Sequence, residues 1–190
     1  MSSRGPRANG TDGTDFTHRQ KIASHYQISV QYKWYLKWLF AIHVLVLLAF
    51  WVKVFGEFLT RYTKIRWAFF ISLDLPSAYP WEYVWSLSFV PIIFALLSFN
   101  KNRVKILRYH YYGQFVFGIM PCAIGIGSQF PELIDYIFNR ENSKTPTFNG
   151  NFPMVILWYI FFLVAFQIHG LAMYFSHQLI LAWMPPKKKD

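Results

Sequence analysis

The chain has 190 residues, of which 54% are hydrophobic, 21% aromatic and only 15% charged. Soluble domains carry roughly a quarter charged residues, so this composition excludes an ordinary soluble enzyme. The formal net charge is +10. Because the basic residues lie between and beside long apolar runs, they favour the anionic surface of a lipid bilayer over nucleic acid as the partner.

The N-terminal segment is polar and lacks the apolar stretch of a signal peptide. Residues 1–15 are rich in Gly, Ser, Asn and Thr, which predicts a disordered cytosolic N-terminus. After Phe16 an apolar stripe recurs at every fourth residue: Ile22, Tyr26, Val30 and Trp34. This stripe predicts an amphipathic cytosolic helix, which either lies on the membrane or is solvated and continues into the first span.

Four segments are candidates for crossing a bilayer as helices, which takes ~20 mostly apolar residues. They are residues 38–55, 83–99, 109–130 and 152–175. The sequence therefore predicts an all-α polytopic membrane domain over residues 16–183, followed by a cytosolic tail, residues 184–190. The second span is the shortest and most polar of the four. The runs are continuous, without the alternation of a transmembrane β-barrel.

Lysine and arginine residues set the orientation of such a chain. With four spans, thirteen of them flank the spans on the side of the two termini and five on the other side. The basic side faces the cytosol, so both termini are predicted to be cytosolic. The Asn9-Gly10-Thr11 sequon then lies on the cytosolic side and is expected to stay unglycosylated.

The C-terminus ends in Lys187-Lys188-Lys189-Asp190. Lysines at the third and fourth positions from the end, Lys188 and Lys187, form the di-lysine pattern by which the COPI coat retrieves proteins to the endoplasmic reticulum (ER). Pro185 and Pro186 favour an extended backbone that holds them clear of the membrane. The alternative is that these lysines are only the positive flank of the last span.

Polar side chains inside the predicted spans are candidates for function, chiefly His43, Gln167 and His169, with His110 and Gln114 at the start of the third span. They suit interhelical hydrogen bonds that aid packing, or else a proton path or part of a metal site. Two histidines without a carboxylate are too few for zinc, and no acidic residue falls within a predicted span. No catalytic residue, metal site or cofactor is therefore predicted.

Three smaller features complete the membrane domain. Lys53, near the end of the first span, is expected to snorkel to the membrane surface. Cys122, the only cysteine, is expected to be buried and inert. Small residues in the third span, including Gly118, Gly125 and Gly127, predict a close helix contact there.

Several blocks of the sequence are not generic membrane patterns. They are Gly10-Thr11-Asp12-Gly13-Thr14-Asp15-Phe16, His18-Arg19, His25-Tyr26-Gln27-Ile28-Ser29-Val30, Trp81-Glu82-Tyr83, Leu97-Ser98-Phe99-Asn100, and Gln167-Ile168-His169 with Tyr174, Ser176 and Trp183. These blocks resemble the Jagunal family of ER membrane proteins. The resemblance covers almost the whole chain. It implies a four-span ER protein with cytosolic termini, without enzymatic activity, that acts in ER organisation and in vesicle-mediated transport through the secretory pathway, in association with the COPI coat.

Two functions of different classes follow from these observations. The first is a binding protein of the ER membrane whose tail lysines dock on COPI subunits. The second is a small transporter or channel that uses His43, Gln167 and His169, for which the missing intramembrane acid and inverted repeat are unfavourable.

Overall fold

The computed structural model describes residues 14–63, 68–73, 75–140, 143–148 and 152–184. Its helices are α1 (Thr14–Phe58), the π-helix η1 (Leu59–Thr63), α2 (Ala68–Ser72), α3 (Pro80–Trp85), α4 (Phe89–Phe99), α5 (Val104–Gln114), the π-helix η2 (Phe115–Ile119), α6 (Met120–Phe138) and α7 (Met154–Trp183). A short antiparallel pair of strands, β1 (Thr147–Phe148) and β2 (Phe152–Pro153), precedes α7.

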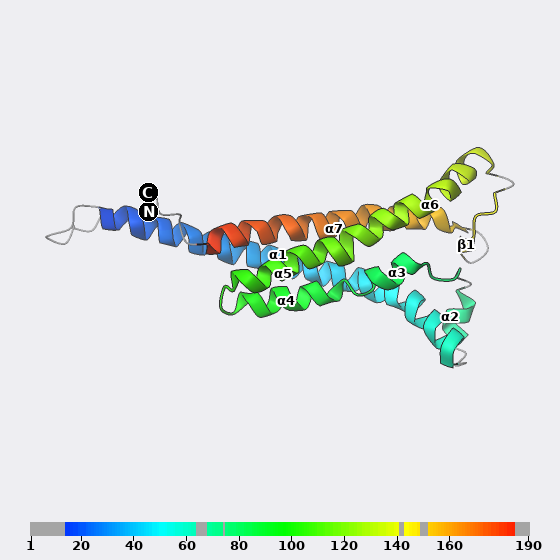
Figure 1. Cartoon of the computed structure of the whole chain (residues 1–190), viewed down its shortest axis with the longest axis horizontal. Helices are drawn as coiled ribbons and strands as arrows, with labels where there is room; N and C mark the ends of the chain where they lie inside the picture. Colours follow the sequence, from blue (N-terminus) through cyan, green and yellow to red (C-terminus); the bar gives the residue numbers. More distant parts are fainter. Residues whose placement is uncertain (1–13, 64–67, 74, 141–142, 149–151, 185–190) are drawn as a thin grey trace.

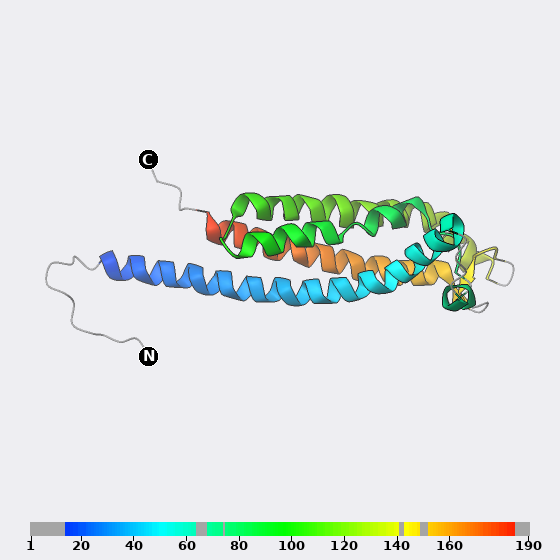
Figure 2. The same ribbon diagram turned by 90° about the horizontal axis from the view of Figure 1, so that it is seen from below.

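The helices form four rods that run up and down one long axis (Figure 1). Helix α1 is the first rod, α3 with α4 the second, α5 with η2 and α6 the third, and α7 the fourth. The start of α1 and the end of α7 lie at the same end of the bundle, which we call the proximal end (Figure 2). There the Trp183 Nε1–H donates a hydrogen bond to Ser29 Oγ at 2.8 Å. The opposite end, with α2 and the two strands, is the distal end.

Three of the four rods are long and apolar enough to cross a membrane: Ser24–Thr63, Pro80–Phe99 and Met154–Trp183. The first, second and fourth predicted spans thus have helices that suit them. The third rod is less apolar, because it carries buried His110, Gln114 and Gln129. The expectation that the second span would be the weakest was therefore wrong; the third is.

Helix α1 is one continuous helix from Thr14 to Phe58, about 67 Å long at 1.5 Å per residue. No break separates the predicted amphipathic segment from the first span, so the alternative of a helix that continues into the span holds. Tyr26, Val30 and Trp34 are all exposed, while the side chain of Ile22 lies outside the described residues. A location of this segment on the membrane surface is not confirmed.

Proline residues explain why the second and third rods are irregular. Pro91 has no N–H to donate to Leu87, and the chain between α3 and α4 instead makes tight turns, with the Ser88 N–H donating to the Trp85 carbonyl at 2.9 Å. In the third rod Pro121 follows η2, where the wider π-turn accommodates a residue that cannot donate. Both irregularities flank the buried polar residues described below.

The interior consists of two layers of apolar side chains along the axis. The proximal layer includes Leu36, Leu107 and Leu179, all fully buried. The distal layer is rich in aromatic rings, with Trp85 and Phe162 at its centre, and it also buries Cys122 as predicted. Polar groups lie where these two layers meet and at the distal edge of the second.

Candidate functional site in the membrane core

A cluster of buried polar side chains lies halfway along α7, between the two apolar layers. His43 from α1 and His169 from α7 are 1% and 0% exposed, and their rings meet edge to face with centroids 4.8 Å apart. The His43 Nε2 atom lies 2.9 Å from Ser88 Oγ, in the turn between α3 and α4. This cluster therefore joins the first, second and fourth rods at the middle of the bundle.

Both ring nitrogens of His169 are hydrogen-bonded, and the partners fix its tautomer. Trp85 Nε1–H can only donate, and it does so to His169 Nε2 at 3.0 Å. The opposite nitrogen, Nδ1, then carries the hydrogen of the neutral ring and donates to Gln114 Oε1 at 2.5 Å. The chain of bonds Trp85–His169–Gln114 links the second, fourth and third rods through one imidazole ring.

This arrangement is suited to packing. Neither His169 nitrogen has a lone pair left to bind a metal ion, and protonation of Nε2 would cost the bond from Trp85. Within the part of the chain that the structure describes, no group of three His, Cys, Asp or Glu residues could hold a metal. His110 is held through one nitrogen, since its Nδ1 donates to the Pro91 carbonyl at 2.8 Å, while its Nε2 is buried without a hydrogen-bond partner among the described residues.

Gln167 is not part of the cluster. Its side chain is exposed, whereas His169 two residues later is buried. Residues i and i+2 of a helix point in different directions, so the helical phase alone separates the two. The structure thus places Gln167 apart from His43 and His169, and helical spacing in the sequence already contained the signal.

Small residues bring the third rod against this cluster, as predicted for two of the three glycines. A Cβ atom added to Gly118 would overlap the His169 ring at Nδ1, and one on Gly125 would lie within 2.5 Å of the Phe162 ring. Gly127 is different, because a Cβ there meets nothing within 4 Å. Gly118 thus allows the backbone of η2 to touch the imidazole that Gln114 holds.

A second buried polar group, near the distal edge, was missed by the sequence analysis. Lys53 Nζ lies 2.6 Å from both carboxylate oxygens of Glu82, and the two side chains are 7% and 0% exposed. Lys53 Nζ also stands 4.5 Å from the ring centre of Trp158, within the range of a cation–π interaction. Glu82 accepts a third hydrogen bond, from the Tyr79 N–H at 3.0 Å.

This ion pair corrects two predictions. Lys53 does not extend outward to the membrane surface but is buried between α1, α3 and α7. Glu82 lies inside the Pro80–Phe99 rod, so an acidic residue does fall within a helix that could cross the membrane. The spacing of 29 residues gives no local pattern, and only the contact between the two rods reveals the pair.

The spacing of two lysines along α1 matches the thickness of a bilayer. Lys33 and Lys53 each lie ten residues from His43, which is about 15 Å along a helix. A hydrocarbon core is ~30 Å thick, so a midplane at His43 places both lysines at its two boundaries. Lys33 Nζ donates to the Phe99 carbonyl at 2.8 Å and to Asn102 Oδ1 at 2.7 Å, which fastens α1 to the turn after α4.

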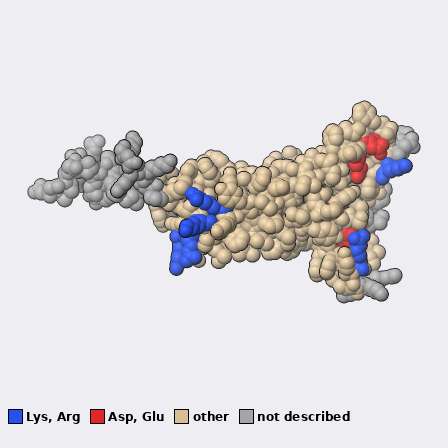
Figure 3. Space-filling model, viewed as in Figure 1, with Lys and Arg blue, Asp and Glu red and all other residues tan. Residues whose placement is uncertain are grey.

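Charges gather at the two ends of the bundle, with a wide uncharged band between them (Figure 3). Between residues 24 and 184, where the structure describes the side chains, the charged residues at the proximal end are all basic: Lys33, Lys37, Lys101, Arg103, Lys105 and Arg108. The distal end mixes both signs, since Arg61, Arg140 and Lys144 accompany Glu57, Glu132 and Asp135. There the Asn139 side-chain N–H donates to Asp135 at 2.8 Å, which lowers the pKa of that carboxyl group.

The predicted retrieval motif, Lys187 and Lys188, lies outside the described residues, as do the N-terminal residues 1–13 with the Asn9 sequon. What the structure does describe is the end of α7 at Trp183, on the basic proximal side. Arg108 Nη2 lies there too, 3.6 Å from Met184 Sδ.

These features define a polytopic helical membrane protein with a closed polar core and one basic end. Residues 1–187 match the family described as "Jagunal, ER re-organisation during oogenesis". The chain is 60% identical to a protein jagunal homolog of Caenorhabditis elegans, over 99% of this chain and all of that one, and 59% identical to its counterpart in Caenorhabditis briggsae. It is 32% identical to the human protein jagunal homolog 1, over 96% and 94% of the two chains.

The protein therefore belongs to the Jagunal family, as its sequence blocks indicated. The family description names ER re-organisation and no catalytic reaction. Two of the blocks that carry the resemblance supply buried contacts of the structure. Trp81-Glu82-Tyr83 provides the carboxylate for Lys53, and Gln167-Ile168-His169 provides the imidazole that joins three rods.

Proposed function

We propose that this protein is a non-enzymatic, four-pass ER membrane protein that organises the ER and acts in vesicle-mediated transport, with Lys187 and Lys188 engaging the COPI coat from the cytosol. The observation that carries this proposal is the basic proximal end, at which α1 begins and α7 ends. A cytosolic proximal end puts the tail lysines on the side where a coat assembles.

The arrangement of the rods supports four crossings. Because α1 starts and α7 ends at the same end of the bundle, the chain travels along the axis an even number of times (Figures 1 and 2). The third rod contains 23 consecutive uncharged residues, from Tyr109 to Pro131. As a helix this stretch is about 34 Å long, enough for the ~30 Å hydrocarbon core. Its polar side chains His110, Gln114 and Gln129 are buried, away from lipid.

The charge distribution supports the orientation. Short loops rich in Lys and Arg stay on the cytosolic side of a membrane, and between residues 24 and 184 the charged residues of the proximal end are all basic. The distal end carries both signs and the larger loops. In this orientation the proximal part of α1, from Thr14 to Tyr32, extends into the cytosol by about 28 Å beyond Lys33.

The orientation can be tested with single cysteines in sealed ER microsomes. In a Cys122→Ala background, Lys101→Cys at the proximal end should react with a membrane-impermeant maleimide. Lys144→Cys at the distal end should react only after the microsomes are permeabilised. Both positions are exposed in the structure. Labelling of both in sealed microsomes, or of Lys144→Cys alone, would refute the proposed topology.

The coat interaction is tested at the tail. Changing Lys187 and Lys188 to Ser should weaken coat capture in pull-downs and let the protein escape to the Golgi. Lys189→Ser is the matched control, because it removes one positive charge and keeps the lysines at the third and fourth positions from the end. Equal loss in both variants would indicate a general charge effect, and no loss in either would remove the tail from the mechanism.

The hydrogen bonds of His169 support this binding function over a transporter. A proton path needs groups that can exchange protons along a route, whereas both nitrogens of this ring are committed to fixed partners. Proton flux through the purified protein in liposomes that is lost in His169→Ala would instead favour the transporter.

A further inference from the structure

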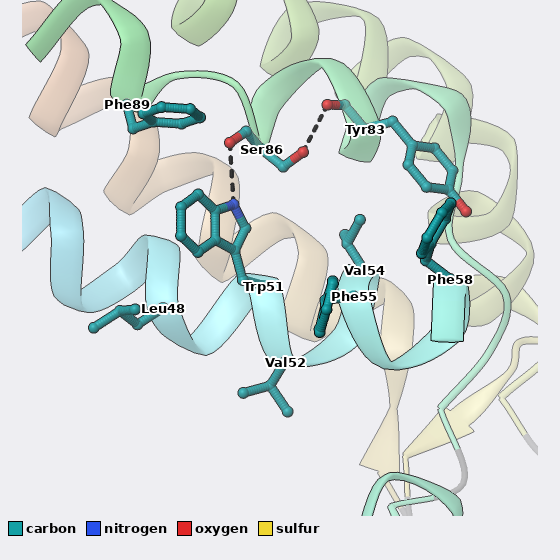
Figure 4. A pocket seen from close by; sticks show the side chains of 9 residues that line it. All are labelled: Leu48, Trp51, Val52, Val54, Phe55, Phe58, Tyr83, Ser86 and Phe89. Carbon is teal, nitrogen blue, oxygen red and sulfur yellow. Dashed lines mark hydrogen bonds between the residues drawn. The ribbon is translucent and has the colours of Figure 1, made fainter. Parts of the chain in front are cut away.

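An apolar groove of about 640 Å³ opens between α1 and the α3–α4 rod in the distal half of the bundle (Figure 4). Leu48, Val52 and Phe55 line it from α1, and Tyr83 and Phe89 line it from the other side. Its few polar atoms are engaged locally, since Trp51 Nε1–H donates to the Ser86 carbonyl at 3.1 Å and Ser86 Oγ–H to the Tyr83 carbonyl at 2.7 Å. Apart from the Tyr83 hydroxyl, the lining of the groove therefore offers no polar group to a ligand.

The position of the groove along α1 indicates which part of the bilayer surrounds it. It follows α1 from Leu48 to Phe58, ten residues or about 15 Å, and so reaches from the interior of the uncharged band to its distal boundary at Lys53 and beyond. With the midplane at His43, the part of the groove from Leu48 to Val52 lies at the depth of the hydrocarbon of the distal leaflet, and the part from Val54 to Phe58 lies at the depth of the lipid headgroups. An elongated apolar chain, such as one acyl chain of a lipid, matches its lining and its direction.

A polar hollow of about 380 Å³ lies next to the distal end of this groove. Glu57 and Arg61 line it, together with Thr60 and Ser77. Phe58, the last groove residue of α1, directly follows Glu57, and Arg61 lies about one helical turn further along the same chain. A chain seated in the groove would thus leave its polar end beside these two charges.

The two charges at the hollow are complementary to a zwitterion. Glu57 is only 8% exposed and its Oε1 has no hydrogen-bond donor, while its other oxygen accepts the Ala78 N–H. The Arg61 guanidinium is 58% exposed, and its Nη1 lies 3.7 Å from Glu57 Oε1, which is too long for a hydrogen bond. An anion can therefore bind to Arg61 while a cation with N–H groups donates to Glu57.

We propose that this groove and hollow bind a glycerophospholipid with a primary ammonium headgroup, of the phosphatidylethanolamine class. One acyl chain fills the groove, the phosphate binds the Arg61 guanidinium, and the ammonium group donates to Glu57 Oε1. Phosphatidylcholine has no N–H to donate, so Glu57 Oε1 would stay without a partner. Phosphatidylserine adds a carboxylate beside Glu57, where like charges repel.

The test uses the full chain in mild detergent, incubated with equal amounts of palmitoyl-oleoyl phosphatidylethanolamine and phosphatidylcholine and examined by native mass spectrometry. Val52→Trp fills the groove, and Glu57→Gln removes the carboxylate charge while keeping an acceptor for Ala78. The matched control is Leu163→Trp, which adds the same ring at an exposed apolar position of α7, away from the groove. Resistance of Cys122 to maleimide verifies folding in each variant.

We expect the wild type to retain one phosphatidylethanolamine with about a tenfold preference over phosphatidylcholine, as one hydrogen bond to a charged group implies. Val52→Trp should lose both lipids, Glu57→Gln should lose the preference, and Leu163→Trp should resemble the wild type. Equal retention of the lipids by folded Val52→Trp and wild type would overturn the proposal. A wild-type dimer that Val52→Trp converts to a monomer, without a change in lipid, would assign the groove to a second copy instead.

Discussion

The Lys53–Glu82 ion pair gives the sharpest test of how this bundle is held together. Replacing Lys53 by Met would leave a carboxylate with 0% side-chain exposure and no cation beside it. Replacing Glu82 by Gln keeps an acceptor for the Tyr79 N–H but leaves the Lys53 ammonium against the Trp158 ring without a counter-charge. Each single change should therefore destabilise the fold.

The magnitude follows from burial. An exposed ion pair contributes about 0–1 kcal/mol, because water and salt screen it. Removing one partner of a buried pair costs about 3–5 kcal/mol, because the remaining charge is desolvated without compensation. Since Lys53 and Glu82 are both nearly inaccessible, we expect about 3 kcal/mol or more for each single variant. The double variant Lys53→Met with Glu82→Gln should be more stable than either, because it leaves no buried charge.

Cys122 provides the assay. It is the only cysteine of the chain and is fully buried in the distal aromatic layer, so its reaction with a maleimide reports unfolding. Labelling across a sodium dodecyl sulfate titration in mixed micelles gives the free energy of unfolding for the wild type and the three variants. Arg61→Gln is the control, because the Arg61 guanidinium is 58% exposed and its 3.7 Å contact with Glu57 is too long for a hydrogen bond, so its loss should cost under about 1 kcal/mol.

The double-mutant cycle decides the outcome. A coupling energy of about 3 kcal/mol between Lys53 and Glu82 would confirm the buried contact. If the two single effects simply add, or if each is no larger than that of Arg61→Gln, the pair is solvated in the membrane protein and the reasoning from burial fails.

Two further predictions use the same thiol assay. His169→Ala should cost about 3–5 kcal/mol, because it removes a buried ring and leaves two polar partners unpaired, whereas His177→Ala, at an exposed position of the same helix, should stay within about 0.5 kcal/mol of the wild type. Gly118→Ala should cost about 1–3 kcal/mol, because its Cβ would overlap His169. Gly127→Ala should instead be neutral or stabilising by up to about 1 kcal/mol, and a loss equal to that of Gly118→Ala would contradict the packing argument.

The sequence was sufficient for the helical class and for the location of most of the rods. Apolar runs with basic residues between them dictate membrane helices, since backbone groups in lipid must bond within their own segment. The sequence was less reliable on whether the first helix is continuous and on which predicted span is the least apolar. It left open whether the helix after Phe16 lies on the membrane or continues into the first span, as α1 does, and it judged the second span weaker than the third, although the third carries the buried His110 and Gln114.

The polar interior required the tertiary structure. His169 could be singled out as a polar residue at membrane depth, but its partners Trp85 and Gln114 are 84 and 55 residues away along the chain. Lys53 was misjudged for the same reason, since a long side chain near a span end can reach either the membrane surface or a neighbouring helix. The position of Gln167 did not require the tertiary structure, because helical spacing alone places it on a different face from His169.

The sequence by itself thus determined that this Jagunal protein is a helical membrane protein with one strongly basic side, because hydrophobicity and charge act through local composition. Only the tertiary structure decided which polar groups are buried together. Partner choice in a bundle depends on which helix faces meet and at what height, and these are set by close packing at residues such as Gly118 and by the turn before Pro91. That packing converts isolated polar residues into the Trp85–His169–Gln114 chain and the Lys53–Glu82 pair.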